Sequence, residues 1–483
     1  MIRSISLGAW ASLLVMLSAC QATPPITTLQ ITVPSFDQDA PIYTATYTVS
    51  PTFTLSPTMT STSTPTHTAT FTPTITATAT ATATHTPSPL PTVALHTLTP
   101  VSPLGLHPAT TIEDAPLPAP SGWSCGNVPC EADLAGHARR IGVPSGFEVE
   151  HVGRFNAQVQ QITYGRDGLL YATALTDGIA QGAILTLNPQ DGAVSVYSEG
   201  MMNPLGLAFQ PDTDVLYVSA RASRTQGGML YRIPEGGGTP ETVLDTLPCC
   251  WREVDNQVNG MVFGMDGYLY VGVSALSDHG EADNPTDAQP FQEPQQLEAT
   301  ILQIDPHTQT IGIYAKGIRH PFDLDFDSRG RFYATDSGTV EGIGDRLLRL
   351  EVGAHYRFPY YGLLGCSNCP PPRADLTYSD GMWSFPAYTL PRGIAVYKGL
   401  NFPQNLFNNV FVALWNDNGN GQRVVRFDPA SLPTDAVALA SYQPQPFVTG
   451  LLRPVDVIVS PSGTLVVADS IYGDIWEVRY RAE

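Results

Sequence analysis

A two-strand pattern that recurs six times restricts this chain to few folds. Each copy has a strand of alternating apolar residues, a turn that carries Asp or Gly, and a second strand that often begins Leu-Tyr. In the copy at 261–273, Gly267 supplies the backbone freedom that a short turn needs, and Asp266 can hydrogen-bond back onto the turn. The other copies lie at 162–173, 207–219, 324–336, 394–414 and 457–469.

The spacing of these copies predicts a closed ring of sheets. Six copies in roughly 340 residues match the spacing of four-stranded propeller blades. We therefore predict an all-β fold, a six-bladed β-propeller, because radial closure removes exposed sheet edges. Residues 147–152 are expected to pair into the last blade and close the ring, and a pair of β-sandwiches is the alternative. Outer strands are expected at 183–188, 229–233, 300–305, 424–428 and 474–478.

A Thr/Pro-rich tract precedes the repeats. Thr occupies every even position from Thr58 to Thr86, and the residues between give no consistent apolar face to bury. Such tracts are typical of extended, disordered and O-glycosylated stalks. We assign residues 20–120 to a disordered tether and residues 121–483 to the propeller.

The first twenty residues predict export and a lipid anchor. An apolar stretch that is too short to span a bilayer ends in Leu17-Ser18-Ala19-Cys20, a lipobox-like sequence. We expect residues 1–19 to be a lipoprotein signal peptide and Cys20 to carry the lipid, which would anchor the protein to the membrane facing the periplasm or the cell exterior. An ordinary signal peptide with a chance cysteine is the alternative.

The other six cysteines fit an oxidising compartment. An even number in an exported protein predicts disulfides. A zinc site is the alternative, but the spacing lacks two C-x-x-C pairs. The local pairs are Cys125–Cys130, Cys249–Cys250 and Cys366–Cys369.

The formal charge of −20 limits the kinds of molecule that the protein can bind. An acidic surface repels phosphate, so no nucleic-acid partner is expected. The same balance is compatible with calcium, which prefers oxygen ligands.

Polar residues gather in the loops that flank the predicted inner strands. Arg319 and Arg453 each precede a copy of the repeat, and two guanidinium groups in one funnel suit an anionic ligand. The structural alternative for each is a solvated charge or an interblade ion pair. His279, beside Asp278 and Glu281, is either part of a calcium or acid/base site or a polar loop residue.

From about 143 to 480 the sequence resembles the six-bladed quinoprotein glucose/sorbosone dehydrogenases. The segments that carry the resemblance are NGMVFGMDGYLYVGV, ATILQID, GIRHPFDLDFD, GAHYRFPYYG, GLNFPQNLFNNVFVALW and RPVDVIVSPSGTLVVAD. In that family pyrroloquinoline quinone (PQQ) lies over the channel mouth with Ca²⁺. A histidine there removes the proton of the sugar hydroxyl.

The resemblance assigns roles to five residues. Arg319 matches the arginine that stabilises negative charge on the quinone oxygen, and Arg453 matches one that binds a cofactor carboxylate. The backbone carbonyls of Gly338 and Thr339 match calcium ligands. Asn203 falls near a polar substrate contact.

The departures from the family pattern concern the base and the charges. Asn256 stands at the position of the catalytic histidine, and an amide has no pKa that would make it a general base near neutral pH. Val455 replaces a second arginine. No lysine occurs between 410 and 420, and the usual Asp-Glu-Leu-Asn segment is Asp345-Arg346-Leu347-Leu348.

These features predict a membrane-anchored, extracytoplasmic, PQQ- and calcium-dependent dehydrogenase of a sugar or polyol. It would pass electrons to an external acceptor, with Asp255 or His279 as the base in place of Asn256. One alternative is a propeller that binds a carbohydrate or cofactor without turnover. Another is a lactonase-like hydrolase, which needs convergent carboxylates from several blades.

Overall fold

The computed structural model describes residues 105–107, 110–112, 130–177, 180–224, 226–250, 257–339, 344–416 and 422–481. All of them belong to the unit that spans Pro89–Glu483. The predicted signal peptide at 1–19, Cys20 and the repetitive part of the Thr/Pro-rich tract lie outside the described residues.

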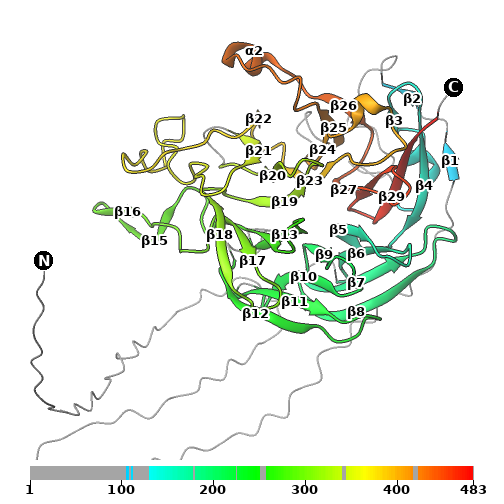
Figure 1. Ribbon diagram of the computed structural model, residues 1–483, viewed down its shortest axis with the longest axis horizontal. Coiled ribbons are helices and arrows are strands. Elements are labelled where there is room, and N and C mark those ends of the chain that lie inside the picture. The colour runs from blue at the N-terminus through cyan, green and yellow to red at the C-terminus, as the bar shows by residue number, and fades with distance from the viewer. Residues whose placement is uncertain are drawn as a thin grey trace, which may run out of the picture. The chain divides into compact units, whose positions relative to one another are not determined.

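The described strands form six blades around one axis, which confirms the predicted fold (Figure 1). Blade 1 contains β5–β8, blade 2 β9–β12, blade 3 β13, β14, β17 and β18, blade 4 β19–β22, blade 5 β23–β26, and blade 6 β27–β29 with β4. A single pairing between Arg221 and Met202 joins blades 1 and 2 into one continuous sheet.

The innermost strands are β5 (Gln158–Tyr164), β9 (Leu207–Phe209), β13 (Val258–Phe263), β19 (Pro321–Phe326), β23 (Pro391–Val396) and β27 (Pro454–Val459). The second strands are β6 (Leu170–Leu175), β10 (Leu216–Arg221), β14 (Leu269–Val273), β20 (Phe332–Asp336), β24 (Val410–Leu414) and β28 (Leu465–Asp469). The third strands are β7 (Gln181–Leu187), β11 (Gly228–Ile233), β17 (Thr300–Ile304), β21 (Asp345–Leu350), β25 (Arg423–Phe427) and β29 (Asp474–Tyr480). The fourth, outermost strands are β8 (Val194–Met202), β12 (Glu241–Leu247), β18 (Ile311–Lys316), β22 (Trp383–Phe385), β26 (Gln445–Val448) and β4 (Phe147–Arg154). The five segments expected as outer strands are therefore third strands of their blades.

All six predicted hairpins are the first two strands of a blade, and the predicted closure is also confirmed. Strand β4 runs antiparallel to β29, from Phe147 opposite Tyr480 to Arg154 opposite Asp474. An early segment of the chain thus completes the blade built by the last segment, which leaves the ring without an open seam.

The hydrogen bond expected from Asp266 back onto its turn is present in blade 3, and blade 1 has the same arrangement. Gly267 has φ of 80°, the backbone N–H of Tyr268 donates to Asp266 Oδ1 (3.2 Å), and the Tyr270 hydroxyl donates to Asp266 Oδ2 (2.7 Å). Asp167 accepts the same two bonds from Leu169 and Tyr171. The Asp therefore fastens both the turn and the strand that follows it.

Two short strands lie before residue 121, where the propeller is expected to begin. Strand β1 (Gly105–His107) pairs with β4, and β2 (Thr110–Thr111) pairs with β3 (Gly142–Val143). Both β1 and β2 lie inside the tract assigned to a disordered tether ending at 120. Composition missed them because their partners lie more than thirty residues away along the chain.

Hydroxyl groups fasten neighbouring blades near the axis. Thr173 donates to the Leu205 carbonyl (2.6 Å), Ser219 to Asn259 (2.8 Å) and Thr335 to Arg392 (2.6 Å), each across a blade boundary. The apolar core between blades consists of separate clusters, with Phe322, Val455 and Leu205 in the cluster nearest the axis. The three hydrogen bonds therefore hold the backbone of each inner strand against the neighbouring blade.

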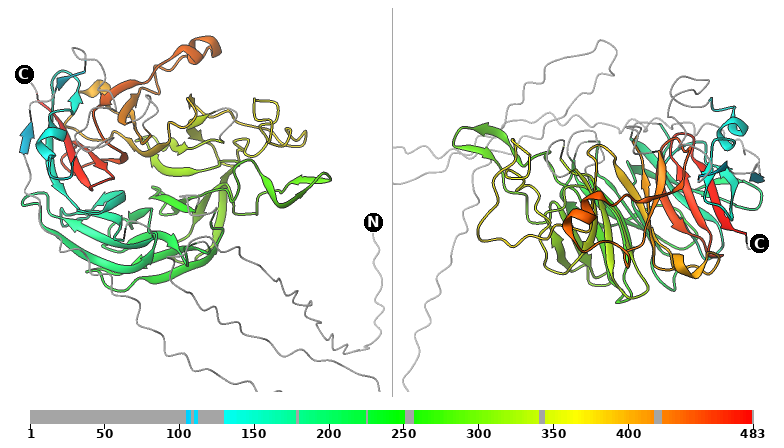
Figure 2. Two further views of the ribbon diagram at one scale, coloured as in Figure 1. Left: turned by 180° about the vertical axis from the view of Figure 1, so that it is seen from behind. Right: turned by 90° about the horizontal axis from the view of Figure 1, so that it is seen from above.

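Smaller elements lie outside the six blades (Figure 2). The hairpin of β15 (Glu281–Thr286) and β16 (Gln289–Phe291) projects from blade 3, and α1 (Leu134–Ala138) packs on blade 6. The others are α2 (Ala436–Ser441) and the 3-10 turn η1 (Gln404–Leu406). Disulfides join Cys249 to Cys250 and Cys366 to Cys369, as predicted, and Cys130 is also disulfide-bonded while Cys125 lies outside the described residues. No helix in the described part of the chain has the length and apolarity needed to cross a membrane.

Candidate functional site

One end of the ring, which we call the rim, collects the predicted site residues. Because the first two strands of a blade are antiparallel, the loop that enters the first strand and the loop that leaves the second lie at the same end. Asn203, Arg319 and Arg453 lie in entering loops, whereas Gly338 and Thr339 lie in a leaving loop. The rim therefore holds five of the predicted residues, whose roles stay predictions.

Arg319 is held by two leaving loops. Its Nη2 donates to Asp278 Oδ1 (2.6 Å), its Nε to the Asp278 carbonyl (3.2 Å), and its Nη1 to the Ser337 carbonyl (3.2 Å). The side chain is 7% exposed. The guanidinium is thus oriented by blades 3 and 4 and lies in a poorly solvated place, where a charge acts over a longer distance than in water.

His279 lies beside the same carboxylate. Its Nε2 is 3.5 Å from Asp278 Oδ2, and this buried nitrogen has no hydrogen bond among the described residues. The side chain is 16% exposed. Glu281 holds the loop by accepting from the backbone N–H groups of Asp278 (3.1 Å) and His279 (2.6 Å). Asp278 of this loop therefore lies between the imidazole of His279 and the guanidinium of Arg319.

His320 belongs to the protein core. It is 3% exposed, and its Nδ1 lies 2.7 Å from the Ser274 hydroxyl. Its backbone N–H donates to Asp336 Oδ1 (2.8 Å). This histidine positions the entry to β19 and does not reach the rim surface.

The loop of Gly338 and Thr339 is fastened by a buried carboxyl group. Asp345 accepts from Gly338 N (2.9 Å) and from Leu390 N (2.7 Å), which ties blade 4 to blade 5. Burial raises the pKa of Asp345 to about 6 although these backbone bonds oppose the shift. Among the described residues no three His, Cys, Asp or Glu side chains gather as metal ligands, so calcium here would rely on backbone carbonyls.

Asn203 is engaged by the neighbouring blade. Its amide donates to Gln257 Oε1 (2.9 Å), and Gln257 Nε2 donates to the Asn203 carbonyl (3.0 Å). Gln257 is fully buried and also accepts from Arg221. Asp255 and Asn256, predicted at the base position, lie outside the described residues.

Arg453 lies over an aromatic ring at the rim, and sequence reasoning missed what surrounds it. The Arg453 guanidinium carbon is 5.0 Å from the centroid of Trp415, in the loop that leaves β24. Arg392, the second residue of β23, lies 5.5 Å from the same centroid and 4.5 Å from that of Phe322. The available signal was the Pro-x-Asp/Gly sequence that opens three inner strands, since it aligns Arg392 with Phe322 and Val455.

A carboxyl pair at the axis was also missed. Asp456 accepts from the backbone N–H of Ile162 (2.7 Å), and Asp323 accepts from that of Ile394 (2.9 Å), each in the next blade. The two side chains hydrogen-bond to each other. Burial raises the pKa of Asp323 to about 7, and burial together with the Asp323 charge raises that of Asp456 further. Through these backbone hydrogen bonds, Asp456 links blade 6 to blade 1 and Asp323 links blade 4 to blade 5.

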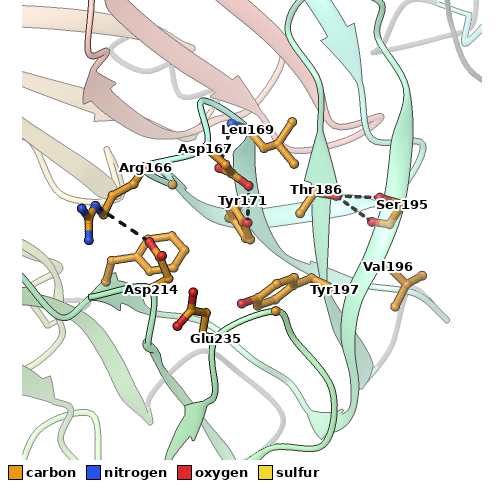
Figure 3. A pocket seen from close by; sticks show the side chains of 13 residues that line it. Arg166, Asp167, Leu169, Tyr171, Thr186, Ser195, Val196, Tyr197, Asp214 and Glu235 are labelled. Atoms are coloured by element: carbon orange, nitrogen blue, oxygen red, sulfur yellow. Dashed lines mark hydrogen bonds and ion pairs between the residues drawn. The ribbon is translucent and has the colours of Figure 1, made fainter. Parts of the chain in front are cut away.

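A cavity of about 650 Å³ opens at the opposite end of the blades, between blades 1 and 2 (Figure 3). The rings of Tyr171 and Tyr197 meet edge to face at 4.9 Å, with the carboxylates of Asp214 and Glu235 nearby. The turn after β5 lines it, so the cavity lies away from the rim residues.

No family model matches the chain. An uncharacterized protein of Borreliella burgdorferi is 28% identical over 207 residues, and the match covers 39% of this chain and 54% of that protein. The chain thus spans about half the length of this curated relative, which names no activity.

Solved structures share the architecture. The PQQ-bound aldose sugar dehydrogenase of Streptomyces coelicolor has a TM-score of 0.50 at 19% identity, over 70% of this chain and 99% of that chain. The apo aldose sugar dehydrogenase of Escherichia coli scores 0.52 at 15% identity, over 69% and 100%. A calcium structure of the Trichoderma reesei AA12 carbohydrate-active enzyme scores 0.53 at 14% identity, over 70% and 97%. This chain has the six-bladed propeller fold of the PQQ-type sugar dehydrogenases.

Proposed function

We propose that the protein oxidises a hydroxyl group of a sugar or polyol. PQQ would be the immediate electron acceptor, and Ca²⁺ would be the second cofactor. The observation that carries the proposal is the rim itself. It brings two arginines and an imidazole–carboxylate pair to the end of a propeller whose fold is shared with PQQ-type sugar dehydrogenases.

The rim residues fit an anionic planar cofactor. Guanidinium groups pair with carboxylates through two parallel hydrogen bonds, so Arg453 would hold a carboxylate of PQQ. Arg319, oriented by Asp278, would face negative charge on the quinone. The carbonyls of Gly338 and Thr339 would supply oxygen ligands to Ca²⁺. When bound, PQQ takes up the two electrons that leave the alcohol carbon.

His279 would act as the general base. Its Nε2 lies 3.5 Å from Asp278 Oδ2 and its Nδ1 lies 3.9 Å from Glu281 Oε2. With the proton of the neutral imidazole on Nε2, the lone pair at Nδ1 would accept the proton of the substrate hydroxyl. Asp278 then stabilises the imidazolium and still holds Arg319. Because an amide at Asn256 cannot accept that proton, His279 replaces the base expected at that position.

The cellular setting belongs to the same proposal. The leader at 1–19 and the lipobox Cys20 support a protein anchored by lipid outside the cytoplasm, which donates electrons to an external acceptor. Labelling with a radioactive fatty acid should mark the wild type and leave a Cys20→Ser variant unlabelled. Equal labelling of both would contradict the anchor.

Reconstitution tests the activity. Purified protein is incubated with PQQ and Ca²⁺, and reduction of a redox dye is followed with a panel of aldoses and polyols. We expect reduction that requires PQQ, Ca²⁺ and one class of sugar. Binding of PQQ without dye reduction by any sugar would favour a second candidate, a propeller that binds the cofactor without turnover, which Asn256 supports.

A further inference from the structure

A second cavity, of about 420 Å³, lies between blades 4 and 5. Arg331 and Tyr333 line it at the start of β20, and Arg349 lines it at the end of β21. Leu432 and Leu439, from the segment that follows β25, line it from blade 5. Because the turn between β19 and β20 lies opposite the loops of the rim, this cavity is at the other end of the ring. We call it the blade 4–5 cavity.

The Tyr333 hydroxyl lacks the partner that its counterparts in other blades have. In blades 1 and 3 the tyrosine three residues after the turn glycine donates to an aspartate of the turn: Tyr171 to Asp167 (2.9 Å) and Tyr270 to Asp266 (2.7 Å). Tyr333 is fully buried at the same position of its repeat, and its hydroxyl has no hydrogen-bond partner among the described residues. A buried hydroxyl of this kind is uncommon in folded proteins and calls for an explanation.

The sequence of the blade 4 turn explains the missing partner. Arg329 stands where the other two turns have their aspartate. Asp327, two residues earlier, accepts from the backbone N–H groups of Arg329 (2.9 Å) and Arg331 (2.8 Å), and it also pairs with the Arg331 side chain. The carboxylate of this turn is therefore engaged with backbone and guanidinium groups, and none reaches the Tyr333 hydroxyl.

The charges around Tyr333 favour an acceptor. Burial raises the pKa of Tyr333 although the charges of Arg331 and Arg349 oppose the shift, so the hydroxyl keeps its proton and can donate it to a hydrogen bond. Asp327 is the one negative charge that acts on this hydroxyl, against the two guanidinium groups. The surroundings of the hydroxyl thus carry a positive balance, which suits a negatively charged oxygen.

Two further carboxylates line the cavity. Asp380 pairs with Arg357 (2.7 Å), so its charge is already compensated. Glu351 is exposed and lies one residue beyond the end of β21. Its charge opposes the binding of an anion, so it provides a test of the sign of the ligand.

We propose that the blade 4–5 cavity binds a small carboxylate that has an apolar body. The carboxylate accepts from the Tyr333 hydroxyl, as the turn aspartate does in blades 1 and 3, and it meets the guanidinium groups of Arg331 and Arg349. The apolar body lies against Leu432 and Leu439. The cavity and the rim lie at opposite ends of the ring, so binding here requires no PQQ.

Calorimetric titration of the full-length protein tests the site. Hexanoate is the probe, acetate is the same head group without the chain, and hexanol is the same chain without the charge. We expect hexanoate to bind more tightly than acetate, because its chain buries apolar surface, and more tightly than hexanol, because only a carboxylate pairs with the arginines.

Substitution of Tyr333 separates ligand binding from stability. We expect Tyr333→Phe to weaken hexanoate binding about 10- to 100-fold, because a hydrogen bond to a charged group is lost. Its melting temperature should not fall, because the hydroxyl has no partner in the protein to lose. Tyr270→Phe is the matched control. It removes the bond to Asp266, so its melting temperature should fall while hexanoate affinity stays at the wild-type value.

Substitution of the charged residues tests the sign of the ligand. Arg349→Gln should weaken hexanoate binding, and Glu351→Gln should strengthen it. Opposite changes in these two variants would overturn an anionic ligand.

The remaining outcomes decide on the carboxylate and on the site. Equal hexanoate affinity in the wild type and in Tyr333→Phe would overturn the role of the hydroxyl. Hexanol binding as tight as that of hexanoate would overturn the carboxylate. A wild type that binds neither hexanoate nor acetate at millimolar concentration would overturn the site. The titrations contain no PQQ, so none of these results bears on the proposed function.

Discussion

The seam that closes the ring and the part of the rim around Arg453 surround their arginines with different groups. At the seam, Asp474 accepts from Arg154 Nε (2.7 Å) and Nη2 (2.9 Å), with His151 Nε2 at 3.0 Å. His137 of α1 stands between Asp469 (3.5 Å) and Asp474 (3.8 Å). At the rim, Arg392 and Arg453 lie against aromatic faces.

At the seam, the charged side chains pair with one another and so stabilise the fold. Burial alone would raise the pKa of Asp474, but the nearby His137 and the hydrogen bonds from His151 and Arg154 outweigh it and keep the pKa low. Arg453 is held in another way: its Nη1 donates to the Leu452 carbonyl (3.2 Å), and its guanidinium lies over Trp415.

Removal of the proposed base should have the largest effect, a loss of catalytic activity. It tests whether the rim carries the reaction. We expect His279→Gln to lower dye reduction by about 10²- to 10⁴-fold, because the substrate proton loses its acceptor. PQQ affinity should change little. His307→Gln, in an exposed turn, is the matched control and should keep full activity. Unchanged turnover in His279→Gln would show that another group is the base.

Substitution at the seam should affect stability instead. We expect Asp474→Asn to lower the free energy of unfolding by about 3–5 kcal/mol, because Arg154 would stay buried without its carboxylate. Urea unfolding measures the change. Asp435→Asn, at the exposed N-terminus of α2, should cost less than about 1 kcal/mol. Equal losses in the two variants would contradict the structural role of the seam.

The axial carboxyl pair should make stability depend on pH. The folded pKa of Asp323 is raised to about 7 and that of Asp456 is raised as well, so the folded state binds protons that the unfolded state releases. Their contribution is complete below about pH 4 and is lost as the pH rises through 7. We expect a decrease on the order of 2–4 kcal/mol between pH 4 and 8. Asp456→Asn should flatten this slope, and an unchanged slope would contradict the raised pKa values of the pair.

The smallest effect should come from the hydroxyl that links the axis to the rim. Thr335→Val removes the donor to the Arg392 carbonyl and the acceptor for Asp323 N. We expect a loss of about 1–3 kcal/mol in stability. Thr308→Val, in an exposed turn, is the control, and equal effects in both would argue against the link.

The sequence predicted what depends on local pattern and strand direction. Apolar alternation and turn residues located all six hairpins, and the antiparallel geometry placed Arg319 and Arg453 at the same end. The sequence did not predict Asp278 as the partner of Arg319, or the contacts of Arg392 and Arg453 with Trp415. Those contacts join residues of different loops and blades, and no periodicity within one segment encodes them.

Apart from β4, the fourth strands of the blades were not predicted. Strand β22 has three residues and β26 has four, too few for a repeated alternation to stand out. Strand β21 was read only as a departure from the family pattern, because Arg346 interrupts its apolar run. In the structure that arginine is buried and pairs with Asp336.

A crystal structure of the protein soaked with PQQ and Ca²⁺ tests the central claim most directly. We predict quinone density at the rim, with a carboxylate oxygen within hydrogen-bond distance of Arg453. Density only in the cavity between blades 1 and 2, or none at saturating PQQ, would contradict it.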